Sequence, residues 1–119
     1  MLNDESDQAL MARSAAGNRP AFDVLAGRYM LRLRRAALRV LNEPAAAEDA
    51  AQDALLRAWM RASSYDAEQA GVSTWLHRIV VNAAIDRVRA QRPTIDLPET
   101  LLDPAEAADM MLLGLERRQ

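Results

Sequence analysis

Apolar side chains recur every three or four positions along most of the chain, which is the spacing of amphipathic helices. A first helix is predicted from about Ser6 to Ala16, with Gly17 as its stop. A second is predicted from near Pro20 to about Leu41, because proline suits a first helical turn. This second helix carries a long apolar stripe that we assign to the core: Phe22, Leu25, Ala26, Tyr29, Leu33, Ala36, Ala37 and Val40.

The segment 73–93, STWLHRIVVNAAIDRVRAQRP, predicts a helix with two unlike faces. Ser73 suits its N-cap and Pro93 ends it. One face is apolar and suits the core: Leu76, Ile79, Val80, Ala83 and Ala84. The other face carries guanidinium, amide and carboxylate groups: Arg78, Asn82, Asp86 and Arg89. Such groups can hydrogen-bond base edges and pair with phosphates, although a solvated face with internal ion pairs explains the same spacing equally well.

Between these helices, Asn42-Glu43-Pro44 is a break, and a third helix is predicted from about Ala45 to Ala62. Its buried stripe is predicted to be Ala51, Leu55, Ala58, Trp59 and Ala62. Its outer stripe is predicted to be Asp49, Gln52, Asp53, Leu56 and Met60. Exposed leucine and methionine beside carboxylates favour a surface that docks on another protein.

The remaining segments are a loop and a tail. Residues 63–72, SSYDAEQAGV, predict a loop whose Tyr65 packs as an anchor. Residues 94–102 predict an acidic linker, and residues 104–116 a short helix with a cluster of methionine and leucine. We therefore expect one domain over residues 1–93, followed by the linker and helix of residues 94–119.

Composition indicates an all-α fold: a compact bundle of about four helices plus the short C-terminal helix. Only 4% of residues are aromatic, and 4 glycines and 5 prolines interrupt a chain whose apolar content is mostly alanine and leucine. The 119 residues suffice for one domain with a modest core.

Charge is unevenly distributed. The net charge is −2, but residues 1–93 hold 13 Arg and 11 acidic residues, whereas residues 94–119 hold 2 Arg and 6 acidic residues. A basic stripe runs beside the core stripe of the second helix: Arg28, Arg32, Arg35 and Arg39. The stripe suits a nucleic acid or an acidic partner, although a solvated face is the simpler interpretation.

Several function classes are disfavoured. The chain has no cysteine and one histidine, His77, which excludes disulfides, thiolate metal sites and multi-histidine metal sites. No glycine-rich phosphate loop or nucleophile–base pair is present, so we expect neither an enzyme nor a cofactor. The acidic N-terminus and the lack of a run of about 20 apolar residues indicate a soluble cytoplasmic protein.

Three segments in order resemble region 2 of a bacterial sigma factor of the extracytoplasmic-function (ECF, group IV) type. AFDVLAGRYMLRLRRAALRVL is similar to the first long helix of region 2. AEDAAQDALLRAW is similar to the helix that binds core RNA polymerase, and STWLHRIVVNAAIDRVRAQRP to the helix that recognises the promoter. The resemblance covers about residues 7–93. It implies a sigma domain that recognises and helps melt the −10 element in transcription initiation.

The resemblance also implies two sets of site residues. The clamp helices of the largest polymerase subunit would contact the third helix through Asp49, Gln52, Asp53, Leu56, Arg57 and Met60. The non-template strand of the −10 element would meet the loop and the fourth helix through Tyr65, Ser73, Arg78, Ile79, Asn82, Asp86, Arg89 and Arg92. Within this set, Asn82 would approach a flipped base and Arg92 a phosphate.

The sequence departs from the family in one respect. Sigma factors of this type carry a second domain, region 4, that reads the −35 element, and here only the last residues resemble its beginning. We therefore expect a shortened form whose autonomous promoter recognition is weak. The family also predicts an anti-sigma factor that masks the same surfaces. Two alternatives stay open: a helical module that reads duplex DNA, and a protein-interaction bundle without a nucleic-acid role.

Overall fold

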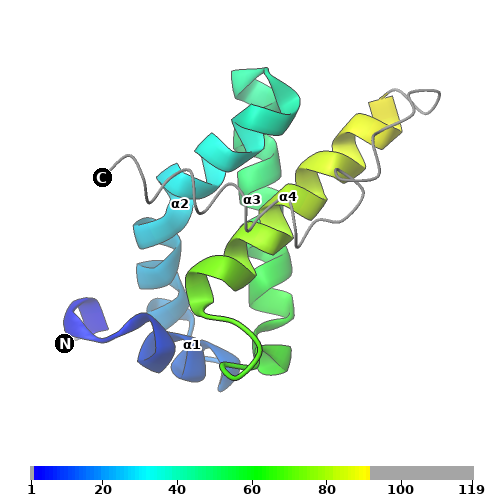
Figure 1. Ribbon diagram of the computed structural model, residues 1–119. Helices are drawn as coiled ribbons and strands as arrows, with labels where there is room; N and C mark the ends of the chain where they lie inside the picture. The colour runs from blue at the N-terminus through cyan, green and yellow to red at the C-terminus, as the bar shows by residue number, and fades with distance from the viewer. Residues whose placement is uncertain (1, 92–119) are drawn as a thin grey trace.

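The computed structural model describes residues 2–91, which form an all-α bundle (Figure 1). Its elements are η1 (Leu2–Asp4), α1 (Asp7–Ala15), α2 (Arg19–Leu41), α3 (Pro44–Met60), η2 (Ala62–Ser64) and α4 (Val72–Gln91). Over this range the predicted fold class is confirmed. The predicted acidic linker and C-terminal helix lie outside the described residues.

The helix boundaries follow from local capping. Asn18 caps α2 by accepting a hydrogen bond from the Ala21 amide at 3.1 Å. Asn42 ends α2 in the left-handed region at φ 55°, and its amide donates to the Leu38 carbonyl at 2.8 Å. The Glu43 carboxylate then accepts from two amides at the start of α3, which opens with Pro44. The predicted break at residues 42–44 is therefore a pair of caps.

The bundle packs α2, α3 and α4 against one another, with α1 across the lower end of α2 (Figure 1). Alanines fill the buried side of α3 and allow close helix approach: Ala47, Ala50, Ala51, Ala54 and Ala58. Larger side chains from the other helices complete the core, among them Leu10, Met11, Leu25, Leu33, Leu76 and Val80. The apolar stripe predicted for residues 20–41 is largely confirmed.

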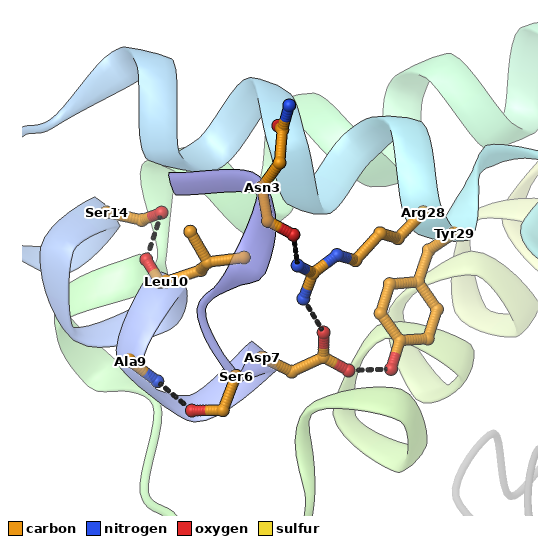
Figure 2. Close-up of polar contacts among 8 residues, drawn as sticks. All are labelled: Asn3, Ser6, Asp7, Ala9, Leu10, Ser14, Arg28 and Tyr29. Carbon is orange, nitrogen blue, oxygen red and sulfur yellow. Dashed lines mark hydrogen bonds and ion pairs between the residues drawn. The ribbon is translucent and has the colours of Figure 1, made fainter. Parts of the chain in front are cut away.

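A polar junction holds α1 on α2. The Asp7 carboxylate accepts a 2.8 Å bond from Arg28 and another from the Tyr29 hydroxyl, and Arg28 also donates to the Asn3 carbonyl at 2.7 Å (Figure 2). Burial and the hydrogen bond to Asp7 raise the pKa of Tyr29 to about 12, against an opposing hydrogen bond from Ser73. One arginine of the predicted basic stripe, Arg28, is thus committed to an internal ion pair.

Two local predictions were wrong. Helix α4 begins at Val72, so Ser73 lies in its first turn rather than at the N-cap. Trp59, predicted to be in the core, is only partly buried at its edge, where its ring packs on Phe22 with a centroid distance of 5.4 Å. No helix within residues 2–91 is long and apolar enough to cross a membrane.

Candidate functional site

The outer face of α4 is polar, as its spacing predicted. Arg78 and Asn82 are half-buried along this face, and Asp86 and Arg89 are exposed. Ile79 is only 7% exposed and belongs to the core, so it is removed from the surface residues with which it was grouped. Arg92 lies outside the described residues. We define the outer face of α4 as Trp75, Arg78, Asn82, Asp86 and Arg89.

The loop before α4 is held by its own side chains. The Tyr65 hydroxyl donates to the Ala70 carbonyl at 2.9 Å, and the Tyr65 ring packs edge-on against Trp75 at 5.2 Å between centroids. The Asp66 carboxylate accepts from the Glu68 amide at 2.9 Å. Tyr65 is therefore the anchor that the sequence suggested, and it fixes the loop against the first turns of α4.

Sequence reasoning missed Trp75 as a member of this face. It is half-buried, three positions before Arg78 and seven before Asn82, which places all three on one side of the helix. That spacing was visible in the sequence, but the tryptophan was not assigned a role there. An aromatic ring beside an amide and a guanidinium adds a stacking surface to the hydrogen-bonding groups.

His77 lies on the opposite side of α4 and is fully buried. Its Nδ1 lies 2.8 Å from the Ser73 carbonyl oxygen. Because a carbonyl oxygen only accepts, Nδ1 carries the proton and Nε2 is the acceptor, and within residues 2–91 Nε2 has no hydrogen-bond partner. Burial lowers the pKa of His77, the Arg32 charge lowers it further, and the bond to Ser73 opposes both.

The outer face of α3 is mixed apolar and acidic. Leu56 is 56% exposed and Met60 73%, and Asp49 and Gln52 are exposed beside them. A cavity of about 190 Å³ lies at the edge of this face, between α2 and α3. Its lining comprises Arg19, Phe22, Asp23, Ala26, Gln52, Leu55, Leu56 and Trp59. We define the outer face of α3 as Asp49, Gln52, Asp53, Leu56 and Met60.

Arg57 joins the two outer faces. Its guanidinium lies 3.0 Å from Asp53 one turn earlier on α3 and 3.1 Å from Asp86 on α4. The sequence assigned Arg57 and Asp86 to different partners, whereas the structure pairs them. The carboxylates of Asp53 and Asp86 are thereby oriented by one cation that is itself mostly buried against both helices.

Comparison with known proteins identifies the family. The sigma-70 region 2 family matches residues 25–94. The ECF RNA polymerase sigma factor SigM of Mycobacterium tuberculosis is 43% identical over 99 residues, covering 82% of this chain and 50% of that protein. SigW of Bacillus subtilis is 36% identical over 77 residues, covering 65% of this chain and 41% of that protein. The chain thus spans about half the length of the curated relatives it matches.

A solved structure gives the same assignment at the level of the fold. An engineered region 2 of sigmaE, in complex with GTAAAA, superposes with a TM-score of 0.70 at 31% identity, covering 78% of this chain and 96% of that one. The likeness extends over the bundle that presents the two outer faces. The chain therefore belongs to the sigma-70 region 2 family, among the extracytoplasmic-function sigma factors.

Proposed function

We propose that this domain acts in transcription initiation by docking on core RNA polymerase and by recognising and helping to melt the promoter −10 element. The observation that carries the proposal is the outer face of α4. There Asn82 lies half-buried between Arg78 and Arg89 on one side of the helix. The sigmaE region 2 that shares this fold is in complex with GTAAAA, which supports a DNA role for this domain.

The chemistry of the face suits an unpaired strand. An amide both donates and accepts hydrogen bonds, so Asn82 can pair with the edge of a base that has left the stack. Arginines on either side can contact the adjoining phosphates. Removing a base from the duplex costs a few kcal/mol, which contacts of the base and its neighbouring phosphates with this face would offset. A net charge of −2 gives little general attraction to duplex DNA, so polymerase would supply much of the affinity.

The outer face of α3 is the proposed polymerase contact. Leu56 and Met60 supply apolar anchors, and Asp49 and Gln52 supply polar groups around them. The partner would be the clamp helices of the largest polymerase subunit. An anti-sigma factor is the proposed regulator, acting by covering the two outer faces, and the site of action is the cytoplasm.

The test measures binding of the single-stranded hexamer GTAAAA, compared with its complement, to the wild-type chain and to Asn82→Ala. We expect sequence-dependent binding by the wild type and about a tenfold loss in the variant, or ~1.4 kcal/mol, which lies within the ~1–3 kcal/mol of one good base contact. Gln8→Ala, which removes an exposed amide on α1, is the matched control and should bind as the wild type.

Circular dichroism and thermal melting would establish that each variant is folded. If Asn82→Ala bound both strands as well as the folded wild type, the α4 face would not be the reading surface. If the folded wild type bound neither strand, the alternative of a protein-interaction bundle would be favoured.

A further inference from the structure

A second basic surface lies on α2. Arg32, Arg35 and Arg39 are exposed and follow one another at steps of three and four, along the same edge of the helix. No carboxylate of residues 2–91 lies within ion-pair distance of any of the three. We call these three residues the α2 arginine edge.

Five other arginines of the described residues are neutralised in place, whereas Arg61, Arg87 and Arg89 form no ion pair within residues 2–91 either. Ion pairs join Arg13 to Glu5, Arg19 to Asp23, Arg28 to Asp7, Arg34 to Glu48, and Arg57 to Asp53 and Asp86. Like charges three or four residues apart on a helix destabilise it by a few tenths of a kcal/mol per pair. Arg35 and Arg39 carry that cost without internal compensation, and Arg32 is offset only by its contact with the Tyr29 ring. A surface of this kind suits a polyanion that would neutralise it.

The edge begins near the N-terminal end of α4, on the side of that helix that packs towards α2 rather than on its outer face. The Arg32 guanidinium lies 4.6 Å from the centroid of the Tyr29 ring, and its charge acts on both Tyr29 and His77. Tyr29 and His77 both contact Ser73 in the first turn of α4. From there the edge runs along α2 over a rise of about 10 Å from Arg32 to Arg39.

We propose that the α2 arginine edge binds the backbone phosphates of single-stranded DNA that continues beyond the segment held by α4. The inference rests on the proposed function, because the edge would bind a continuation of the same DNA strand that α4 holds. Guanidinium groups pair with phosphate oxygens in bidentate fashion, and the edge has no amide or carboxylate to read bases. The contact therefore adds affinity and salt dependence without sequence preference.

The test compares two probes, the hexamer GTAAAA and the same hexamer extended by ten thymidines at its 5′ or 3′ end. Binding is measured between 50 and 200 mM salt for the wild type and for Arg35→Ala/Arg39→Ala. The control, Arg13→Ala/Arg34→Ala, removes the same two charges from ion-paired sites. We expect one extended probe to bind the wild type at least fivefold more tightly than the hexamer. The edge variant should lose that gain and reduce the slope of log K against log salt by about 1.4, at ~0.7 per phosphate.

Hexamer affinity should stay within twofold of wild type in both variants. An equal loss in the control variant, or an unchanged slope in the edge variant, would overturn the proposal. So would a loss of polymerase affinity without DNA in the edge variant, because exposed Leu31 and Leu38 border the edge and would suit a protein partner.

The two proposals fail separately. Absence of hexamer binding by the wild type would contradict the proposed role of Asn82. Even then, the proposal for the α2 arginine edge would be supported if the slope of log K against log salt for a thymidine-extended probe were smaller in the edge variant than in the wild type. Absence of binding to every probe by folded protein would overturn both.

Discussion

The outer faces of α3 and α4 lie on neighbouring helices, yet their chemistry differs. The α3 face centres on Leu56 and Met60, which have no hydrogen-bonding group that could read a base. The α4 face has Asn82 at its centre, with Arg78 and Arg89 on either side and the half-buried ring of Trp75 at the N-terminal end. Apolar anchors gain most when another protein removes them from water, whereas amides and guanidinium groups suit base edges and phosphates.

The difference shows how one small bundle can serve two partners. Both helices pack on the same alanine-rich core, so a change in the position of one face would shift the other face as well. The two faces differ only in the side chains that they present to solvent. Arg57 contacts both faces, because it pairs with Asp53 on α3 and with Asp86 on α4. Variants that damage one face alone therefore test the comparison most directly.

The largest effect is expected from Leu56→Ala. We predict a loss of about 2 kcal/mol in binding to the polymerase clamp helices, because a central apolar anchor is removed, and no change in binding to single-stranded DNA. Surface plasmon resonance with the isolated clamp-helix segment would measure it. Leu31→Ala removes a similarly exposed leucine from α2 and should bind normally. Equal losses in both variants would show that α3 has no special docking face.

Acidification should affect both faces together, because His77 lies in the core that they share. Its pKa is lowered on folding, so the unfolded chain binds more protons below the ordinary value of about 6.5. Stability should therefore be retained at neutral pH and fall as the pH drops below that value, by at most about 1.4 kcal/mol per pH unit for this group. Urea unfolding at a series of pH values would measure the slope.

His77→Asn preserves a donor near the position of Nδ1 and removes the titrating ring. The variant is expected to be less stable, and its stability should depend less steeply on pH between 5 and 7. A slope identical to that of the wild type would assign the acid sensitivity to other groups.

The fold was largely predictable from the sequence, since long periodic stripes in residues 20–41 and 73–93 and the breaker at residues 42–44 define the helices. The buried side of α3 was harder to predict, because Ala47, Ala50 and Ala54 are the same residue type as alanines elsewhere on this helix, and hydrophobicity does not distinguish them. Their burial depends on how closely α2 and α4 approach, which is a tertiary property. Trp59 was misplaced because it follows the buried Ala58 by one residue, a step of about 100° that turns its ring to the edge of the core.

The faces were predictable, but their internal contacts were not. Helical spacing grouped Arg78, Asn82, Asp86 and Arg89 correctly, because it fixes direction around the axis. Spacing cannot show which residues of separate helices meet, so the contact of Arg57 with Asp86 was absent from the prediction. For Ile79, spacing correctly predicted the apolar face, where it is buried, whereas the resemblance grouped it with residues that would meet DNA.

A smaller effect is expected from Tyr65→Phe. The substitution removes the hydrogen bond to the Ala70 carbonyl but keeps the ring packed on Trp75, so it should cost about 1 kcal/mol of stability. A looser loop should lower affinity for the hexamer a few-fold and leave clamp-helix binding unchanged. Anisotropy titrations and plasmon resonance on the same preparation would compare the two. A matching loss in clamp-helix binding would indicate that the loop supports both faces.

The smallest effect concerns the bridge between the faces. A double-mutant cycle with Arg57→Met and Asp86→Asn should give a coupling of about 0.5 kcal/mol, because this ion pair is partly open to water and screened by it. Asp86→Asn should also raise affinity for the hexamer slightly, since it removes a negative charge near the phosphates. Thermal melts of the four proteins would supply the cycle. A coupling above about 1.5 kcal/mol would mean that Arg57 ties the two faces into one cooperative unit, and docking on α3 would then be expected to alter DNA binding on α4.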